Sequence, residues 1–115
     1  MSKPVGPYTP VVRAGDLLFV SGQLGLADGA LADGVRAQIA QAVSNLASLA
    51  SAHGATLADV VKTTVFLTDI EDYAAMNEAY CTAFGDHRPA RSAVAVAALP
   101  LGAVAEIEAV IHAPR

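Results

Sequence analysis

Two charged residues near the end of the chain, Arg91 and Glu106, have the clearest capacity for chemistry. Each lies in a run of alternating residues, at 91–97 and at 106–111, which is typical of a β-strand. Because turn-forming residues occupy 99–102, we expect these runs to be two neighbouring strands of one sheet. A guanidinium among Ala and Val side chains must be paired with an anion or must bind one. Two interpretations follow: an ion pair between Arg91 and Glu106 across the strands, or a site for a small carboxylate with Glu106 beside it.

In the second interpretation the two side chains have complementary tasks. The planar guanidinium of Arg91 binds a carboxylate by two parallel N–H bonds. The carboxylate of Glu106 takes a proton from a water molecule and returns it to a leaving group. Glu108 has the same place in the strand alternation as Glu106, so the pattern alone does not separate the two acids.

Three further polar positions can belong to such a site, and each has a plain structural alternative. Tyr8 lies in a proline-rich segment, 1–10, where its ring either pins an extended arm to the core or lines the site. Ser21 and Gly22 follow a predicted strand, so they either end it or offer a hydroxyl and a bare backbone N–H to a ligand. Asn77 lies in a predicted helix, either as a surface amide or as a ligand contact.

The composition predicts one domain, 1–115, that associates with copies of itself. Hydrophobic residues make up 54% of the chain and charged residues 16%, against about 25% charged residues in an ordinary soluble domain. So few charges cannot cover the surface of a monomer, and we therefore expect an oligomer. The apolar runs are too short to cross a bilayer, so no membrane association is expected.

Charge and cysteine content narrow the function classes further. The net charge is −4 and the seven Lys and Arg residues are scattered, which argues against a nucleic-acid partner. The three histidines lie in separate contexts and Cys81 is the single cysteine, so neither a metal site nor any other cofactor is expected. We expect Cys81 to be a buried, inert thiol. A chain that cannot form an intrachain disulfide and shows no targeting segment is expected in the cytoplasm.

The hydropathy pattern predicts the element order β-β-α-β-α-β-β, an α+β fold. Gly15 and Asp16 are expected to form a two-residue hairpin turn, and 25–34 is expected to be a loop. The expected strands are 11–14, 17–20, 61–67, 91–97 and 106–111.

Two helices are expected between these strands. The first is capped by Asp33 and ends before Gly54, and the second begins at Asp69 or Asp72 and ends at Gly85. Two helices can cover only one face of the sheet, so we expect the other face to meet other copies. The apolar side of the second helix is expected to consist of Tyr73, Met76, Tyr80 and Phe84.

Five segments, in this order along nearly the whole chain, give the sequence a resemblance to a known family. The sequence resembles the RidA (YjgF/YER057c/UK114) family of reactive-intermediate deaminases. The segments are VGPYTP at 5–10, LLFVSGQLGL at 17–26, VVKTTVFLTDIEDYAAMNEAY at 60–80, RPARSAVAVAALP at 88–100 and EIEAVI at 106–111.

The resemblance implies a chorismate-mutase-like α+β fold, with two helices on one face of the sheet. It implies a homotrimer with a ligand site in each subunit interface. It also implies an activity: hydrolysis of enamine and imine intermediates, such as 2-aminoacrylate and 2-iminopropanoate, to 2-oxo acids and ammonia.

Carried over by motif, the resemblance assigns a role to most of the candidate residues. The carboxylate-binding arginine falls on Arg91 and the acid near the reacting carbon on Glu106. The substrate-binding positions fall on Tyr8, Ser21, Asn77 and the backbone of Ala93. The backbone of Gly22, beside Ser21, is a further candidate that rests on its bare N–H rather than on the resemblance.

Three positions depart from the family pattern and keep an alternative open. Ala93 stands where the family usually has a cysteine, Thr9 where serine is commoner, and Gly25 where proline is common. Thiol chemistry at Ala93 is impossible, and the substrate preference is in doubt. The alternative function is therefore a non-catalytic trimer that binds a small 2-oxo acid or a related metabolite. RNA cleavage, sometimes attributed to the family, is disfavoured by the acidic net charge and the few aromatic residues.

Overall fold

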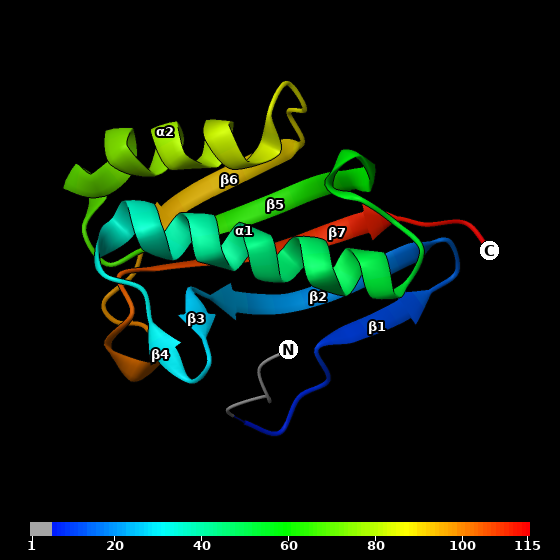
Figure 1. The fold of residues 1–115 in the computed structure, drawn as a ribbon, viewed down its shortest axis with the longest axis horizontal. Coiled ribbons are helices and arrows are strands. Elements are labelled where there is room, and N and C mark those ends of the chain that lie inside the picture. The colour runs from blue at the N-terminus through cyan, green and yellow to red at the C-terminus, as the bar shows by residue number, and fades with distance from the viewer. Residues whose placement is uncertain (1–5) are drawn as a thin grey trace.

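The computed structural model describes residues 6–115 and shows an α+β fold with two helices packed on one face of a five-stranded sheet (Figure 1). The strand order is β1-β2-β7-β5-β6, and β3 and β4 form a separate small hairpin. Residues 1–5 of the predicted arm lie outside the described residues. The elements are β1 (Val11–Ala14), β2 (Leu17–Leu24), β3 (Leu26–Ala27), β4 (Ala30–Leu31), α1 (Gly34–Ala52), β5 (Val60–Leu67), α2 (Tyr73–Phe84), β6 (Ala90–Ala95) and β7 (Ala105–His112).

The last strand, β7, lies at the centre of the sheet. It pairs antiparallel with β2 on one side and with β5 on the other, and β5 pairs parallel with β6 at the edge. The predicted adjacency of the strands that carry Arg91 and Glu106 is therefore wrong, because β5 lies between them. The connection at 96–104 contains a short 3₁₀ turn, Pro100–Gly102, and crosses to the far side of β5 rather than closing a hairpin.

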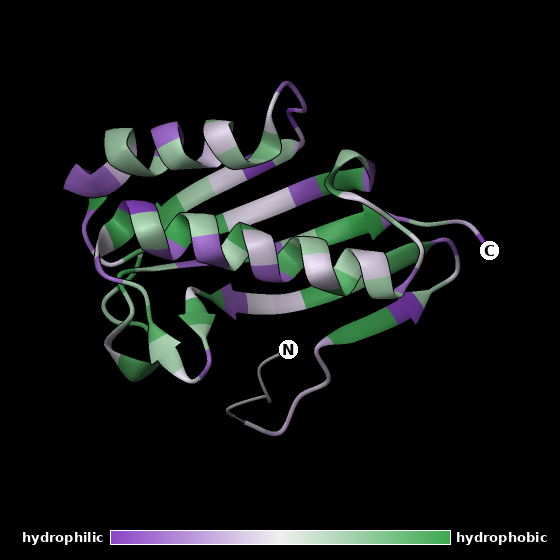
Figure 2. Cartoon of the chain, in the orientation of Figure 1, coloured by the Kyte–Doolittle hydropathy of each residue, from purple (hydrophilic) through white to green (hydrophobic). Residues whose placement is uncertain are grey.

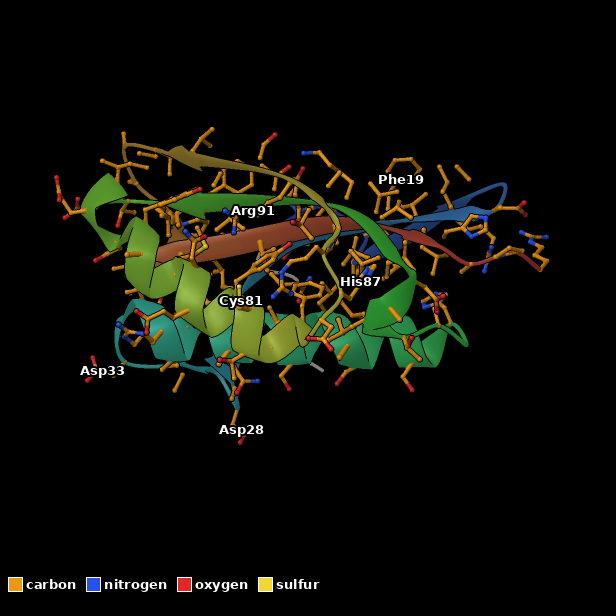
Figure 3. All side chains as sticks on the ribbon, turned by 90° about the horizontal axis from the view of Figure 1, so that it is seen from above. Phe19, Asp28, Asp33, Cys81, His87 and Arg91 are labelled. Atoms are coloured by element: carbon orange, nitrogen blue, oxygen red, sulfur yellow. The ribbon has the colours of Figure 1, made fainter. Side chains whose placement is uncertain are left out.

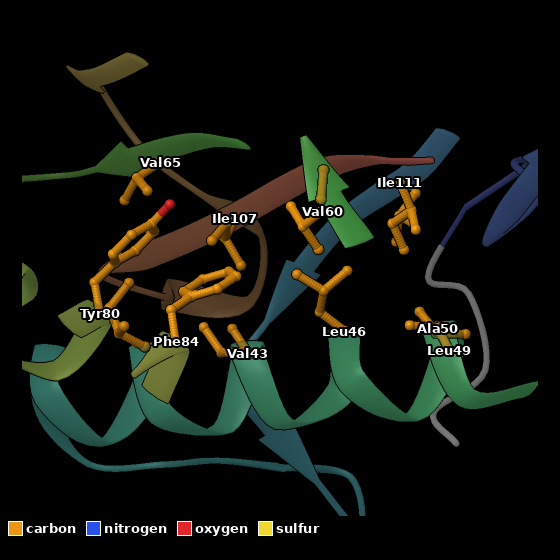
Figure 4. Close-up of a cluster of buried hydrophobic side chains, with 14 of the residues drawn as sticks. Val43, Leu46, Leu49, Ala50, Val60, Val65, Tyr80, Phe84, Ile107 and Ile111 are labelled. Carbon is orange, nitrogen blue, oxygen red and sulfur yellow. The ribbon is translucent and has the colours of Figure 1, made fainter. Parts of the chain in front are cut away.

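The core lies between the sheet and the helices (Figure 4). On β7 the residues Ala105, Ile107, Ala109 and Ile111 are buried, and they alternate with partly or fully exposed residues. Each large apolar side chain buried in this way stabilises the fold by roughly 1.5–3 kcal/mol. The alternation fixes the register, since a slip by one residue would place these side chains on the opposite face.

The predicted ends of the helices are confirmed, although not all the predicted caps are. Asp33 precedes α1 but its side chain accepts no capping hydrogen bond. The carboxylate of Asp69 accepts a bond from the Glu71 N–H at 2.9 Å, so it caps the 3₁₀ turn that leads into α2. Asp72 directly precedes α2, and Gly85, with φ of 66°, ends it.

Two other sequence-based expectations are corrected. Residues 25–34 are not simply a loop, because they contain the β3–β4 hairpin. Cys81 is exposed rather than buried. The buried stripe of α2 is Met76, Tyr80 and Phe84, and a residue one position after Tyr80 is rotated by about 100° away from that stripe.

The sheet face opposite the helices, here called the open face, carries exposed apolar side chains. Val12, Phe19 and Val94 are 50%, 45% and 42% exposed. Figure 3 shows Phe19 on the side of the sheet away from both helices. Among residues 6–115, no helix is long and apolar enough to cross a bilayer.

Candidate functional site

Arg91 lies on the edge strand β6, half-buried beneath α2. Its register partner is Thr63, a buried residue whose hydroxyl contacts α2, so Arg91 points to the helix-covered face of the sheet. Its Nη2 donates to the Tyr73 hydroxyl at 3.1 Å, and its Nη1 lies 3.6 Å from the sulfur of Met76. The Arg91 Cζ lies 5.6 Å from the ring centroid of Tyr73 and 4.9 Å from that of Tyr80.

No carboxylate neutralises Arg91 within the described part of the chain. The one ion pair found there joins Arg36 to Glu78 at 2.6 Å on the outer surface of the helices. The contacts with Tyr73 and Met76 use one N–H of Nη2 and one of Nη1. The remaining N–H groups are enough for a two-bond contact with a carboxylate.

Helix α2 supplies all three of these neighbours. Tyr73, Met76 and Tyr80 stand at positions i, i+3 and i+7, which share one side of a helix. Tyr80 is 3% exposed and its hydroxyl lies 2.7 Å from that of Thr63. Burial raises the pKa of Tyr80 above its ordinary value, so its hydroxyl keeps its proton at neutral pH. The sequence pattern identified this stripe only as an apolar side and missed its contact with Arg91.

Asn77 follows Met76 on α2 and is not a simple surface amide. Its Oδ1 is buried and has no hydrogen-bond partner among residues 6–115. A buried acceptor left without a donor costs about 1–3 kcal/mol. Such groups are typical of sites that a ligand or another chain completes.

The backbone of Ala93 offers a further donor at the sheet edge. The N–H of Val96 donates to Leu67 O at 2.7 Å, and Ala93 is the register partner of Val65. Backbone groups of successive residues in a strand point to alternate sides, so the N–H of Val94 faces β5 and the N–H of Ala93 faces away from it. Because β6 is an edge strand, no other strand of the sheet takes up that N–H.

Glu106 lies on the other side of the sheet, on the open face, between the buried residues Ala105 and Ile107. It is half-buried against β2. A β-carbon built on Gly22 would lie 2.7 Å from Cδ of Glu106 and 2.9 and 3.0 Å from its two carboxylate oxygens. The carboxyl group therefore rests on the bare backbone of Gly22.

The sequence Ser21-Gly22 forms an irregularity in β2 rather than its end. From Val20 to Gln23 the strand advances three residues while β7 advances two, from Ala109 to Ile107. One extra residue in one strand is a β-bulge, which bends the strand and redirects its side chains. Figure 2 shows this end of β2 in white and purple, whereas the start of the strand is green.

The N-terminal arm is attached at the same bulge. The Ser21 hydroxyl donates to Thr9 O at 2.7 Å, and the Ser21 N–H donates to Pro10 O at 2.9 Å. Tyr8, just before this attachment, is 43% exposed. The arm is thus bound where Glu106 and Gly22 meet.

The environment of Glu106 raises its pKa above the ordinary value of 4.5. Burial is the main cause, and the negative charge of Glu108 adds to it. A carboxyl group with a raised pKa exchanges protons more readily near neutral pH. Glu108 is exposed, opposite Thr64 in β5. The structure thus separates two acids that the sequence pattern treats alike.

The candidate residues belong to two clusters, whose charged members Arg91 and Glu106 lie on opposite faces of the sheet. The first comprises Arg91 and Ala93 on the edge strand β6 and Asn77 on α2, the helix that covers Arg91. The second comprises Glu106, the adjoining Gly22 and Ser21 of β2, and Tyr8 in the arm bound to Ser21. Ideal strand spacings place the Cα atoms of Arg91 and Glu106 about 14 Å apart, with β5 between their strands. The predicted alternative, an ion pair between Arg91 and Glu106, is wrong within this chain.

A separate groove of about 480 Å³ lies between the two helices. None of the candidate residues lines it. Its lining consists of Arg36, Ala40, Val43, Ser44, Ala47, Leu57, Glu78, Ala79, Thr82 and Ala83. Nor do any three His, Cys, Asp or Glu side chains of residues 6–115 come together as metal ligands would.

Comparisons with known proteins all point to one family, and the matches span nearly the whole chain. The family model described as endoribonuclease L-PSP matches residues 1–113. A 2-iminobutanoate/2-iminopropanoate deaminase from Mus musculus is 43% identical over 109 residues, which cover 92% of this chain and 81% of that protein. The protein of the same name from Salmonella typhimurium is 40% identical over 111 residues, which cover 92% of this chain and 87% of the relative.

Solved structures agree with these sequence matches. RidA from the Antarctic bacterium Psychrobacter sp. superposes with a TM-score of 0.92 at 41% identity, covering 96% of this chain and 91% of that one. Escherichia coli TdcF with bound serine superposes with a TM-score of 0.90 at 36% identity, covering 95% and 90%. The resemblance found in the sequence is confirmed, and the chain belongs to the RidA/YjgF family, also described as the endoribonuclease L-PSP family.

Proposed function

We propose that this protein hydrolyses 2-imino acids to 2-oxo acids and ammonia in sites shared between two copies of the chain. The observation that carries the proposal is the division of the candidate residues into two clusters, whose charged members lie on opposite faces of the sheet. One cluster has a cation without an anion and the other has an acid with a raised pKa. Relatives at about 40% identity that bear the name 2-iminobutanoate/2-iminopropanoate deaminase support the choice of substrate.

The assembly that joins the clusters is a homotrimer. Burying the apolar side chains of the open face, Val12, Phe19 and Val94, would favour association with other copies. In such a ring, the edge strand β6 of one copy meets β2 and β7 of the next. Arg91, Asn77 and Ala93 then come from one copy, and Tyr8, Ser21, Gly22 and Glu106 from its neighbour.

The first cluster binds the substrate. The carboxylate of the imino acid accepts two parallel hydrogen bonds from Arg91, each contributing roughly 1.5–3 kcal/mol. The outward N–H of Ala93 donates to the bound molecule. The Oδ1 of Asn77 accepts a hydrogen bond from the imine nitrogen. These contacts fix the C=N carbon at the subunit boundary.

The second cluster carries the proton transfers. Glu106 takes a proton from water as the water oxygen bonds to the C=N carbon, and it passes this proton to the imine nitrogen, giving a carbinolamine. Glu106 then takes the proton of the new hydroxyl group and passes it to the same nitrogen as the C–N bond breaks, which yields a 2-oxo acid and ammonia. An enamine such as 2-aminoacrylate first tautomerises to the imine. Ser21 orients the water and Tyr8 closes the site. No metal or cofactor takes part in this scheme.

The second candidate function is a trimer that binds a small 2-oxo acid without turnover. This alternative is retained because Ala93 stands where the family usually has a cysteine. RNA cleavage, which the family description suggests, fits poorly with a net charge of −4 and scattered basic residues. A cytoplasmic location remains part of the proposal.

The test supplies imines with an amino-acid oxidase and traps them with semicarbazide. Active protein lowers the initial rate of semicarbazone formation, because the 2-oxo acid that it produces reacts with semicarbazide more slowly than the imine does, and it accelerates ammonia release. The Arg91→Ala variant is the matched control and should leave this initial rate unchanged. Binding of pyruvate without any effect on trapping, for every imine supplied, would favour the binding protein instead.

A further inference from the structure

We propose that Tyr73 is a positioning residue for Arg91: together with Met76 and Tyr80 it holds the guanidinium in one orientation, with its unused N–H groups left for the ligand. The inference rests on the proposed function, since it deepens the role of Arg91 in binding a carboxylate.

The spacing on α2 places the guanidinium between two aromatic rings. Tyr73 and Tyr80 are two helical turns apart, which separates their positions by about 10 Å along the axis. The Arg91 Cζ lies 5.6 Å from one ring centroid and 4.9 Å from the other. A cation at these distances is attracted by both rings. Met76, between them in the sequence, contacts Nη1 through its sulfur.

The Tyr73 hydroxyl adds direction to this attraction. It accepts a hydrogen bond from Nη2 at 3.1 Å. A cation over an aromatic ring can still turn in its plane, whereas an N–H held by a hydroxyl cannot. With Nη2 bonded to Tyr73 and Nη1 in contact with Met76, rotation about the Nε–Cζ bond would break both contacts. The three unused N–H groups, on Nε, Nη1 and Nη2, therefore keep fixed directions.

The two tyrosines differ in what they can reveal. Tyr80 is 3% exposed and bonded to Thr63, so its replacement would disturb the core. Tyr73 is 43% exposed at the start of α2. Its hydroxyl can be removed with little effect on folding, and its effect on Arg91 can be measured separately.

Fixing a guanidinium in advance lowers the entropy lost when a ligand binds. The hydroxyl is not needed to touch the ligand. Two acceptors on the two hydrogens of one NH₂ group lie about 5 Å apart, too far for a hydrogen bond between them. Tyr73 thus acts through Arg91.

The experiment compares wild type, Tyr73→Phe and Tyr73→Leu in pyruvate binding by calorimetry, in imine hydrolysis, and in the nitrogen NMR signals of the arginine side chains. Tyr73→Phe should weaken pyruvate binding about five- to tenfold and raise KM more than it lowers kcat, and Tyr73→Leu should weaken binding further. The Arg91 Nη signals should be distinct in wild type and averaged in Tyr73→Phe. Glu78→Gln, on the same helix but at the exposed ion pair, is the control and should change none of these.

Tyr73→Phe is also made in the Arg91→Lys background. If Tyr73 acts through the guanidinium, its replacement has no further effect on binding there. An equal loss in both backgrounds, or unchanged binding and unchanged Arg91 signals in Tyr73→Phe, overturns the inference. If wild type neither binds pyruvate nor hydrolyses imines, the proposed function fails, and the NMR comparison alone then decides for or against the positioning role.

Discussion

The carboxyl group of Glu106 lies on the backbone of Gly22, so closely that a β-carbon there would come within 2.7 Å of Cδ. The φ of Gly22 is not in the left-handed region. The glycine is therefore required for the space it leaves rather than for its backbone conformation. A residue without a side chain lets the acid lie against β2 instead of extending into solvent.

Replacing Gly22 by Ala should move Glu106 without unfolding the protein. The end of a glutamate side chain can turn away, so stability should fall only slightly. Catalysis should fall about 10- to 100-fold, because a displaced acid loses its proton-transfer geometry. Steady-state kinetics with thermal unfolding checks this. Normal turnover in the variant would show that the position of Glu106 is unimportant.

Gly25→Ala should have the opposite effect, on folding rather than on chemistry. A β-carbon at Gly25 would lie 2.5 and 2.6 Å from the backbone Cα and O of Gln38 in α1. Backbone cannot turn away, so α1 would have to shift from the sheet. We expect the free energy of unfolding to fall by about 1–3 kcal/mol, the range for overpacked cores. Urea denaturation measures it, and a stability equal to wild type would contradict the close packing.

Arg91→Lys should remove most of the activity, although it keeps the charge. An ammonium cannot form two parallel bonds, and each lost charge-assisted bond corresponds to about a 10- to 150-fold loss. The loss should appear in kcat/KM, while the secondary structure and the oligomeric state stay as in wild type. A near-normal kcat/KM in Arg91→Lys would show that Arg91 does not bind the substrate carboxylate through two hydrogen bonds.

Glu106→Gln should change how stability depends on pH. The raised pKa of Glu106 means that the folded chain favours the protonated form. Its contribution to the free energy of unfolding is therefore greatest below the ordinary carboxyl pKa and is lost as pH rises through the raised value. The Tm of Glu106→Gln relative to wild type should rise over that window and then level off.

Calorimetry of both proteins between about pH 4 and pH 8 covers this window. Glu108→Gln is the control, since Glu108 is exposed. A Tm difference between Glu106→Gln and wild type that stays constant with pH would show that the pKa of Glu106 is not raised in the assembled protein.

The sequence predicted most of the fold, because the fold depends on local patterns. The alternation in β7 marked its buried side, and Asp33 and Gly85 marked helix ends. The order of the strands depends on pairing between segments far apart in the sequence, which local patterns do not show. A turn at 99–102 shows that the chain changes direction, but not that it crosses β5 before pairing.

The candidate site residues were chosen by motif and their roles stay predictions, whereas their arrangement in space could not be predicted. Nothing in the spacing of Arg91 and Glu106 indicates that they face opposite sides of the sheet. The contact between Tyr73 and Arg91 could not be predicted from the sequence. Helical periodicity shows that Tyr73 belongs to the apolar side of α2, but it does not show which residue of the sheet that side chain contacts. Cys81 was misplaced for the same reason, one residue from the buried stripe of that helix.

The central claim, that one site takes Arg91 from one copy and Glu106 from another, is tested by mixing two inactive variants. Arg91→Ala and Glu106→Gln chains, unfolded together in equal amounts and refolded, should form mixed assemblies, which native mass spectrometry confirms. About a quarter of wild-type activity should return, because each shared site has an even chance of an intact residue from either side. Mixed assemblies with no activity above that of the separate variants would contradict a site shared between copies.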